Sequence, residues 1–329
     1  MTEHEDFTED QSQGATGTPG GTVVSLDTLT KDNEEAAGGS GKEVDLPPLH
    51  VLVAEDYGLN QKVISVMLGD MGHRISIANN GQEAVSAVLR GHYDVILMDV
   101  HMPVMDGKTA TRRIRALPRP EGDIPIIALT ADASLEQKDE CLAAGMDDYL
   151  TKPIILPDLL RAMAESLVRA DVSKKERAAP GAAPEAVANS DSGLAVKAVP
   201  VPIVDSSVLV EFASMVGWDT VANLFDTLAK DFVEHRKIIT RAAENHELEV
   251  LRRQTQALNG ALGQFGATKA QETAHVIETL CKAGYSDNAL DLIPQFLQLG
   301  QDSIVELHQF LINMAPSYSA TAPSPSLSI

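Results

Sequence analysis

The chain has 329 residues, of which 44% are hydrophobic and 4% aromatic, with a formal net charge of −21 at pH 7. That length accommodates about two domains of ordinary size, and the excess of acidic residues disfavours nucleic-acid and anionic-membrane partners. No apolar run approaches the roughly 18 residues that span a bilayer, and the acidic start MTEHEDFTED differs from a secretory signal. We therefore expect a soluble, cytoplasmic protein with two reduced structural thiols, Cys141 and Cys281.

Composition divides the chain into two folded blocks and three low-complexity segments. Residues 1–47 form an acidic leader with almost no large apolar side chains to bury, so we expect it to be disordered. An Ala/Pro-rich linker is predicted at residues 171–200, and a disordered tail at residues 315–329. The folded blocks are then residues 48–170 and residues 201–314.

The first block alternates apolar, strand-like runs with segments of helical periodicity. Short continuous apolar runs predict buried parallel strands, and apolar residues at steps of three and four predict helices. The strands are expected at residues 50–54, 75–78, 94–98, 125–129 and 149–150. The helices are expected around residues 63–71, at 81–90, after 107, at 135–144 and at 156–167. This order predicts an α/β fold with a doubly wound, five-stranded parallel sheet covered on both faces.

The second block has only helical periodicity. A short leading helix is expected near residues 205–216, followed by four longer helices with apolar stripes at steps of three and four. The stripes begin with Val221, Leu224, Phe225, Leu228 and Phe232, and continue through Leu248, Leu258, Leu262, Phe265, Ala270, Ile277, Leu290, Ile293, Ile304 and Leu311. We expect an antiparallel, all-α helical bundle.

Polar side chains follow the predicted strands at their carboxyl ends. Glu55 and Asp56 follow the first strand, Asp99 the third, Thr130 ends the fourth, and Lys152 follows the fifth. Because the carboxyl ends of parallel strands meet at one edge of a sheet, these side chains should converge on one cleft. Crowded carboxylates need a cation, and hard oxygen ligands suit Mg²⁺. An ammonium and a hydroxyl beside them would hold a phosphoryl group, so the set predicts a carboxylate nucleophile that attacks phosphorus near a metal ion.

Four stretches carry a family resemblance: VLVAEDYGLNQKV, VILMDVHMPVMDG, IIALTA and GMDDYLTKP. Through them the chain resembles, from about Leu49 to Leu167, the receiver domain of two-component response regulators, especially receivers of hybrid histidine kinases. The resemblance implies a flavodoxin-like fold with Asp99 as the phosphoacceptor. It also implies a Mg²⁺ ion held by Glu55, Asp56, Asp99 and the backbone carbonyl of His101.

The same resemblance implies how the phosphoryl group is bound and supplied. Thr130 and Lys152 would contact it, the Lys152–Pro153 bond would be cis, and Tyr149 would occupy the switch position. The phosphodonor would be a histidine kinase or a histidine phosphotransfer protein. Such a receiver catalyses only its own phosphorylation and dephosphorylation, so no other enzymatic activity is expected.

One helix of the second block, TQALNGALGQFGA, resembles the active helix of histidine phosphotransfer (Hpt) domains. In that pattern a His precedes Leu-Lys-Gly, whereas here Gln256 stands at the His position and Asn259 at the Lys position. A glutamine amide cannot carry phosphate, so the resemblance implies a degenerate Hpt-like domain. Gly260 and Gly263 lie on the same face of the helix. They favour either tight packing within the bundle or a docking surface retained for a receiver, this one or another.

These patterns together predict a phosphorelay protein that signals through protein–protein contact. A receiver or another protein would dock on the bundle, and no nucleic acid or membrane is expected as a partner. One alternative is a detached C-terminal portion of a hybrid sensor kinase that acts as a phosphate sink or scaffold. A DNA-binding regulator is disfavoured by the acidity. An aspartyl-phosphate phosphohydrolase would carry a second Asp where His101 stands.

Overall fold

The computed structural model describes residues 46–131, 134–178, 202–315 and 318, and these belong to one compact unit. The predicted leader, nearly all of the predicted tail and most of the predicted linker lie outside the described residues.

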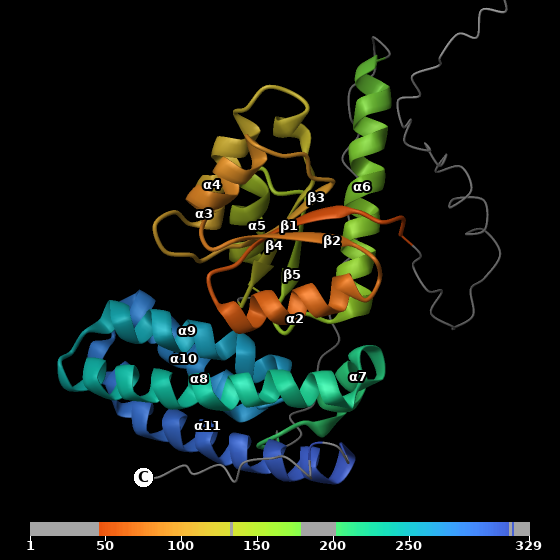
Figure 1. Ribbon diagram of the computed structural model, residues 1–329. Coiled ribbons are helices and arrows are strands. Elements are labelled where there is room, and N and C mark those ends of the chain that lie inside the picture. The colour runs from red at the N-terminus through yellow and green to blue at the C-terminus, as the bar shows by residue number, and fades with distance from the viewer. Residues whose placement is uncertain (1–45, 132–133, 179–201, 316–317, 319–329) are drawn as a thin grey trace, which may run out of the picture. The chain divides into compact units, whose positions relative to one another are not determined.

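Five parallel strands form one sheet in the order β2-β1-β3-β4-β5 (Figure 1). They are β1 (His50–Ala54), β2 (Arg74–Ala78), β3 (Val95–Asp99), β4 (Ile126–Thr130) and β5 (Asp148–Thr151). Every residue of β3 and β4 is buried, which explains their continuous apolar runs, because a central parallel strand is covered on both faces. The predicted five-stranded parallel sheet is confirmed, and each strand lies within one residue of its expected bounds.

Helices cover both faces of this sheet. They are α2 (Gly58–Gly69), α3 (Gly81–Val88), α4 (Gly107–Arg115), α5 (Leu135–Ala143) and α6 (Leu156–Ala178), with a 3₁₀ turn η1 (Glu121–Asp123). Ile64 and Leu68 of α2 pack with Leu159 and Met163 of α6 on one face. The apolar side chains of α3, α4 and α5 pack on the other. The doubly wound arrangement is therefore as predicted.

The helix α6 is longer than predicted. It was expected at residues 156–167 and continues to Ala178. No glycine or proline interrupts the chain between Leu167 and Pro180, and the Ala, Arg, Lys and Glu residues there favour helix. The helix thus extends into the range predicted as linker.

Short polar side chains mark where three of the receiver-like block's helices begin. The side chains of Asn80, Asp106 and Ser134 each accept a hydrogen bond from a backbone N–H three residues further on, which satisfies one of the free donors of the first turn. After Asp106, α4 starts with Gly107, where an added Cβ would overlap the carbonyl oxygen of Asp99. Only glycine therefore lets α4 begin this close to the end of β3.

The second block is an all-α bundle, as predicted. Its helices are α7 (Ser206–Val216), α8 (Trp218–Glu244), α9 (Leu248–Gln264), α10 (Thr268–Ala283) and α11 (Ser286–Met314). Helix α8 contacts α9 and α11, and α10 contacts the same two helices, so the four close around one core, with α7 against α8. The core contains the fully buried side chains of Phe212, Phe225, Phe232, Phe265 and Phe296.

Two composition-based predictions concern thiols and membranes. Cys141 is buried on α5 and Cys281 is partly buried on α10, and both are free thiols. None of the helices in the described ranges is long and apolar enough to cross a membrane.

Candidate functional site

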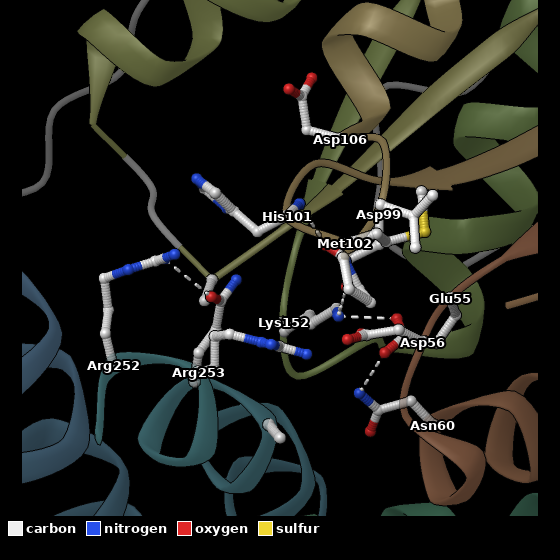
Figure 2. Close-up of a pocket in the computed structure, with 15 residues that line it drawn as sticks. Glu55, Asp56, Asn60, Asp99, His101, Met102, Asp106, Lys152, Arg252 and Arg253 are labelled. Atoms are coloured by element: carbon white, nitrogen blue, oxygen red, sulfur yellow. Dashed lines mark hydrogen bonds and ion pairs between the residues drawn. The ribbon is translucent and has the colours of Figure 1, made fainter. Parts of the chain in front are cut away.

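The polar side chains at the carboxyl ends of the strands meet in one pocket of about 380 Å³ (Figure 2). Strand β1 ends at Ala54 and is followed by Glu55 and Asp56, Asp99 is the last residue of β3, and Lys152 directly follows β5. All four line the pocket. Their convergence follows from the topology, because the ends of parallel strands share one edge of the sheet.

Lys152 lies at the centre of an ion-pair network in this pocket. Its Nζ donates to Oδ2 of Asp99 and to Oε2 of Glu55, each at 2.7 Å. The backbone N–H of His101 donates to the other oxygen of Asp99 at 3.1 Å, and the amide of Asn60 donates to Oε1 of Glu55 at 2.9 Å. The carboxylates of Asp99 and Glu55 are therefore each held at both oxygens, which fixes their orientation.

Burial disfavours the charged form of Glu55, Asp56 and Asp99. It raises the pKa of Glu55 to about 7 and that of Asp56 to about 6, and it also raises the pKa of Asp99, although Lys152 opposes each shift. Burial alone would lower the pKa of Lys152, but Asp99 and Glu55 raise it above its usual value. Excess negative charge in a buried site favours a further cation.

The carboxylate oxygens fit a hard divalent ion. One oxygen each from Glu55, Asp56 and Asp99 lie within 4.8 Å of one another. Hard oxygen ligands with space left for water are what Mg²⁺ requires, and a pocket of about 380 Å³ has room for about a dozen water molecules at ~30 Å³ each.

Two predicted site residues lie beside the pocket rather than in its lining. Thr130 is the buried last residue of β4, paired with Thr151 of β5, and its neighbour Ala131 lines the pocket. Tyr149 is half-buried on β5, with the ammonium of Lys138 5.0 Å from the centre of its ring.

Two further sequence-based expectations concern His101 and the peptide bond between Lys152 and Pro153. The side chain of His101 lines the pocket, and burial, together with Lys282 of α10, lowers the pKa of His101 to about 4. The imidazole is therefore neutral near pH 7. The peptide bond between Lys152 and Pro153 is cis, as expected.

Helix α9 of the bundle completes the pocket wall. Arg252, Arg253 and Gln256 line it together with the strand-end residues (Figure 2). Gln256 was singled out from the sequence, but the two arginines were not, because they precede the Hpt-like stretch and resemble an ordinary solvated charge pair. The available signal was their spacing, one helical turn before Gln256 on the same side of α9.

The two glycines of α9 have different neighbours. A Cβ added at Gly260 would lie 3.2 Å from Cδ of Lys152 and 3.3 Å from Nδ2 of Asn60, both in the first block. A Cβ at Gly263 would instead meet the side chain of Gln271 on α10, within the bundle. Asn259, directly before Gly260, is buried. Gly260 thus allows close approach to the strand-end site, and Gly263 allows close packing of α9 against α10.

Comparison with protein families assigns both blocks. Residues 51–164 match the family model described as a response regulator receiver domain, and residues 221–314 match the model described as an Hpt domain. The chain contains a receiver domain followed by an Hpt domain. Both are modules of two-component phosphorelay signalling.

The chain is similar to a sensor protein and to a histidine kinase. The chain is 32% identical over 254 residues to sensor protein GacS of Pseudomonas syringae, covering 74% of this chain and 27% of that protein. It is 35% identical over 187 residues to histidine kinase 5 of Arabidopsis thaliana, covering 48% of this chain and 20% of the kinase. The chain thus spans about a quarter or less of the length of these relatives.

Among solved structures, the receiver is similar to the receiver domain of a sensor histidine kinase from Pseudomonas aeruginosa. The two are 42% identical, covering 37% of this chain and 99% of that one, with a TM-score of 0.35. That structure has a magnesium ion coordinated in its active-site cleft.

Proposed function

We propose that this protein is a phosphorelay protein whose receiver accepts a phosphoryl group on Asp99 from a histidine kinase or an Hpt protein. One observation carries the proposal: both oxygens of Asp99 are held, by Lys152 and by the N–H of His101, in a pocket where the carboxylates of Glu55 and Asp56 lie close by. An oriented, buried carboxylate beside a fixed ammonium is the arrangement that nucleophilic attack on phosphorus requires.

The chemistry divides among the residues of the pocket. An oxygen of Asp99 attacks phosphorus, the bond from phosphorus to the donor breaks, and the donor leaves with the electron pair. Lys152 and the hydroxyl of Thr130 bind the phosphoryl oxygens. Mg²⁺ would be held by Glu55, Asp56, Asp99 and the carbonyl of His101, and would neutralise negative charge on the transferred group. Tyr149 would respond to the movement of Thr130 as the switch residue.

The Hpt domain is proposed to act by contact rather than by carrying phosphate. Gln256 replaces the histidine of the family pattern, and an amide is not a phosphoryl acceptor. Its position in the wall of the receiver pocket supports a role in contact with the receiver. We expect signalling in the cytoplasm and no enzymatic turnover beyond the receiver's own phosphorylation and dephosphorylation.

A second candidate is a portion of a hybrid sensor kinase that acts as a phosphate sink or scaffold. The observation that favours it is the match to GacS, which runs through 74% of this chain. An aspartyl-phosphate phosphohydrolase is disfavoured, because His101 stands where such enzymes place a second Asp.

The direct test is labelling with acetyl phosphate and Mg²⁺, read as intact mass. We expect one phosphoryl group on the wild-type chain and none on Asp99→Ala, and we expect a chelator to prevent labelling. An adduct that persists in Asp99→Ala would place the phosphate elsewhere. No adduct from acetyl phosphate or from a panel of phosphorylated kinases would refute the proposal.

A further inference from the structure

Helix α2 of the receiver has two apolar faces. Ile64 and Leu68 belong to the receiver core, whereas Leu59, Val63 and Met67 belong to the hydrophobic cluster of the Hpt domain. The last three are only 1%, 2% and 1% exposed. Since burial of apolar surface is the main favourable contribution to association, the two domains are joined by a continuous apolar contact rather than by isolated polar ones.

Polar groups fix the register of this contact. The side-chain amide of Gln264 on α9 accepts a hydrogen bond from the N–H of Ile154 at 3.0 Å and donates to its carbonyl at 3.1 Å. Both bonds are buried. At the start of α2, the hydroxyl of Tyr57 donates to Asp231 of α8 at 3.1 Å. Buried groups paired this way are costly to separate, because each would lose its partner away from water.

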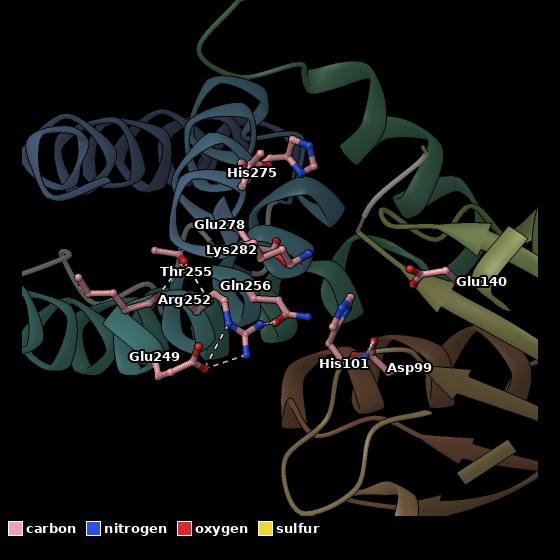
Figure 3. A network of polar contacts seen from close by, with 12 residues as sticks. Asp99, His101, Glu140, Glu249, Arg252, Thr255, Gln256, His275, Glu278 and Lys282 are labelled. Carbon is pink, nitrogen blue, oxygen red and sulfur yellow. Dashed lines mark hydrogen bonds and ion pairs between the residues drawn. The ribbon is translucent and has the colours of Figure 1, made fainter. Parts of the chain in front are cut away.

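The contact covers the phosphorylation pocket itself. Gly260 brings the backbone of α9 against Lys152. One turn earlier, the side chain of Gln256 points toward His101 while its Oε1 accepts a hydrogen bond from Arg252 at 3.4 Å (Figure 3). Helix α9 therefore lies where a donor protein would have to bring its phosphohistidine.

Charge reinforces the position of α9. Figure 2 shows Arg253 extending from α9 into the pocket toward Asp56, and both residues line that pocket. The neighbouring Arg252 instead pairs with Glu249 and Gln256 of its own helix. A cation from the Hpt domain thus faces the acidic cluster of the receiver.

We propose that the Hpt domain is a cis-acting cap on its own receiver, which excludes phosphorylated donor proteins from Asp99 while admitting small phosphodonors. The proposal rests on the proposed function of Asp99. A donor protein must place its phosphorus within about 3–3.5 Å of the attacking oxygen, and its own helix would then occupy the space of α9. A small donor needs only the pocket of about 380 Å³.

The covalent connection makes the competition unequal. A domain in the same chain has an effective concentration on the order of millimolar when a short flexible linker permits docking, and a free donor protein must compete with it. Because a glutamine amide cannot accept a phosphoryl group, Gln256 also prevents transfer of the phosphoryl group from Asp99 to the Hpt domain. Opening the cap should therefore accelerate phosphoryl transfer from donor proteins more than transfer from acetyl phosphate.

The test compares two donors on the full chain. One is acetyl phosphate, and the other is a histidine phosphotransfer protein charged with phosphoramidate and desalted, with that protein's own receiver as positive control. The variants are Gln264→Ala, which removes both bonds to Ile154, and Gly260→Arg, which places a long side chain against Lys152. The matched control is Gln298→Ala, an exposed glutamine on α11 whose hydrogen bond stays within that helix.

The readout is the rate of labelling by the protein donor divided by the rate with acetyl phosphate. We expect this ratio to rise at least about tenfold in Gln264→Ala and Gly260→Arg and to stay unchanged in Gln298→Ala. Hydrogen exchange in α2 should increase in the same two variants. Equal ratios in all chains would overturn the cap, as would faster exchange in α2 without a higher ratio. Absence of labelling from acetyl phosphate in every chain would instead refute the role of Asp99.

Discussion

His73 lies between α2 and β2, buried to 5% exposure, and its Nδ1 accepts a hydrogen bond from the N–H of Leu49 at 3.1 Å. An accepting Nδ1 places the proton of the neutral ring on Nε2, which has no partner in the described part of the chain. Burial lowers the pKa of His73 below 6.5. Protonation of Nδ1 would break the bond to Leu49 and leave a buried charge.

The pH dependence of stability follows from that pKa. Because the folded chain binds the proton less readily than the unfolded chain, His73 lowers the free energy of unfolding as the pH falls below 6.5, and contributes no such loss above it. In His73→Asn the amide oxygen can replace Nδ1 as acceptor, and this contribution disappears. Urea unfolding at about pH 7.5 and pH 5.5 should show a smaller loss of stability for the variant. Parallel pH profiles for the two proteins would contradict the assignment.

The sequence predicts the strand-end residues of the site, and from α9 it singles out Gln256 and Gly260 but neither Arg253 nor Gln264. Glu55, Asp99 and Lys152 could be placed together because apolar runs locate the strands, and parallel strands bring their ends to one edge. The contribution of Arg253 and Gln264 depends on how two domains dock. The hydrophobic periodicity of α9 does not predict that contact, because an arginine and a glutamine are also common at exposed helix positions.

At the scale of elements, the sequence of α2 likewise does not reveal its contact with the Hpt domain. Its apolar residues form one wide stripe in the sequence, which is typical of any helix packed on a sheet. The structure divides the stripe, with Ile64 and Leu68 toward the sheet and Val63 and Met67 toward the Hpt domain. The sequence shows that the apolar stripe of α2 is wide. It does not show whether the extra apolar residues contact the receiver's own core or a second domain.

Helices α8 and α11 pack closely at a position where α11 has a glycine and therefore no Cβ. Gly300 lies on α11 where an added Cβ would overlap the buried ring of Phe232 on α8. We expect Gly300→Ala to lower the free energy of unfolding of the Hpt domain by about 1–3 kcal/mol, since overpacking a tight core forces side chains from their rotamers. Urea unfolding followed by circular dichroism measures the change.

A matched glycine separates this steric effect from helix propensity. Gly58 opens α2, and an added Cβ there would meet nothing within 4 Å. Gly58→Ala should therefore leave stability unchanged or raise it by up to about 1 kcal/mol. If both alanine variants had the same effect, the overlap with Phe232 would not be what requires Gly300.

At the scale of the whole molecule, the two domains share one hydrophobic cluster and one pocket. The cluster joins α2 of the receiver to the core of the Hpt domain, and the pocket is lined by Asp99 on one side and Gln256 on the other. Under the proposed function, a side chain at position 256 would thus face the phosphorylation pocket. Gln256 and Asn259 stand where the Hpt pattern described above has His and Lys.

That geometry predicts that Gln256→His restores phosphotransfer within the chain. After labelling with acetyl phosphate, an imidazole nitrogen attacks phosphorus, the bond from phosphorus to the Asp99 oxygen breaks, the carboxylate is released, and the imidazole proton passes to water. Phosphohistidine survives base and is lost in acid, whereas an acyl phosphate is lost in base. We therefore expect a base-stable phosphoryl group in Gln256→His and only a base-labile one in the wild-type chain.

Two controls decide whether the transfer depends on the position of α9. Combining Gln256→His with Asp99→Ala should abolish the base-stable label, because phosphate reaches the new side chain only through Asp99. Gln298→His adds an exposed imidazole on α11, outside the pocket lining, and should remain unlabelled. If Gln256→His formed the acyl phosphate but no base-stable product, α9 would not hold that side chain within reach of Asp99, and the shared pocket would be a contact without transfer geometry.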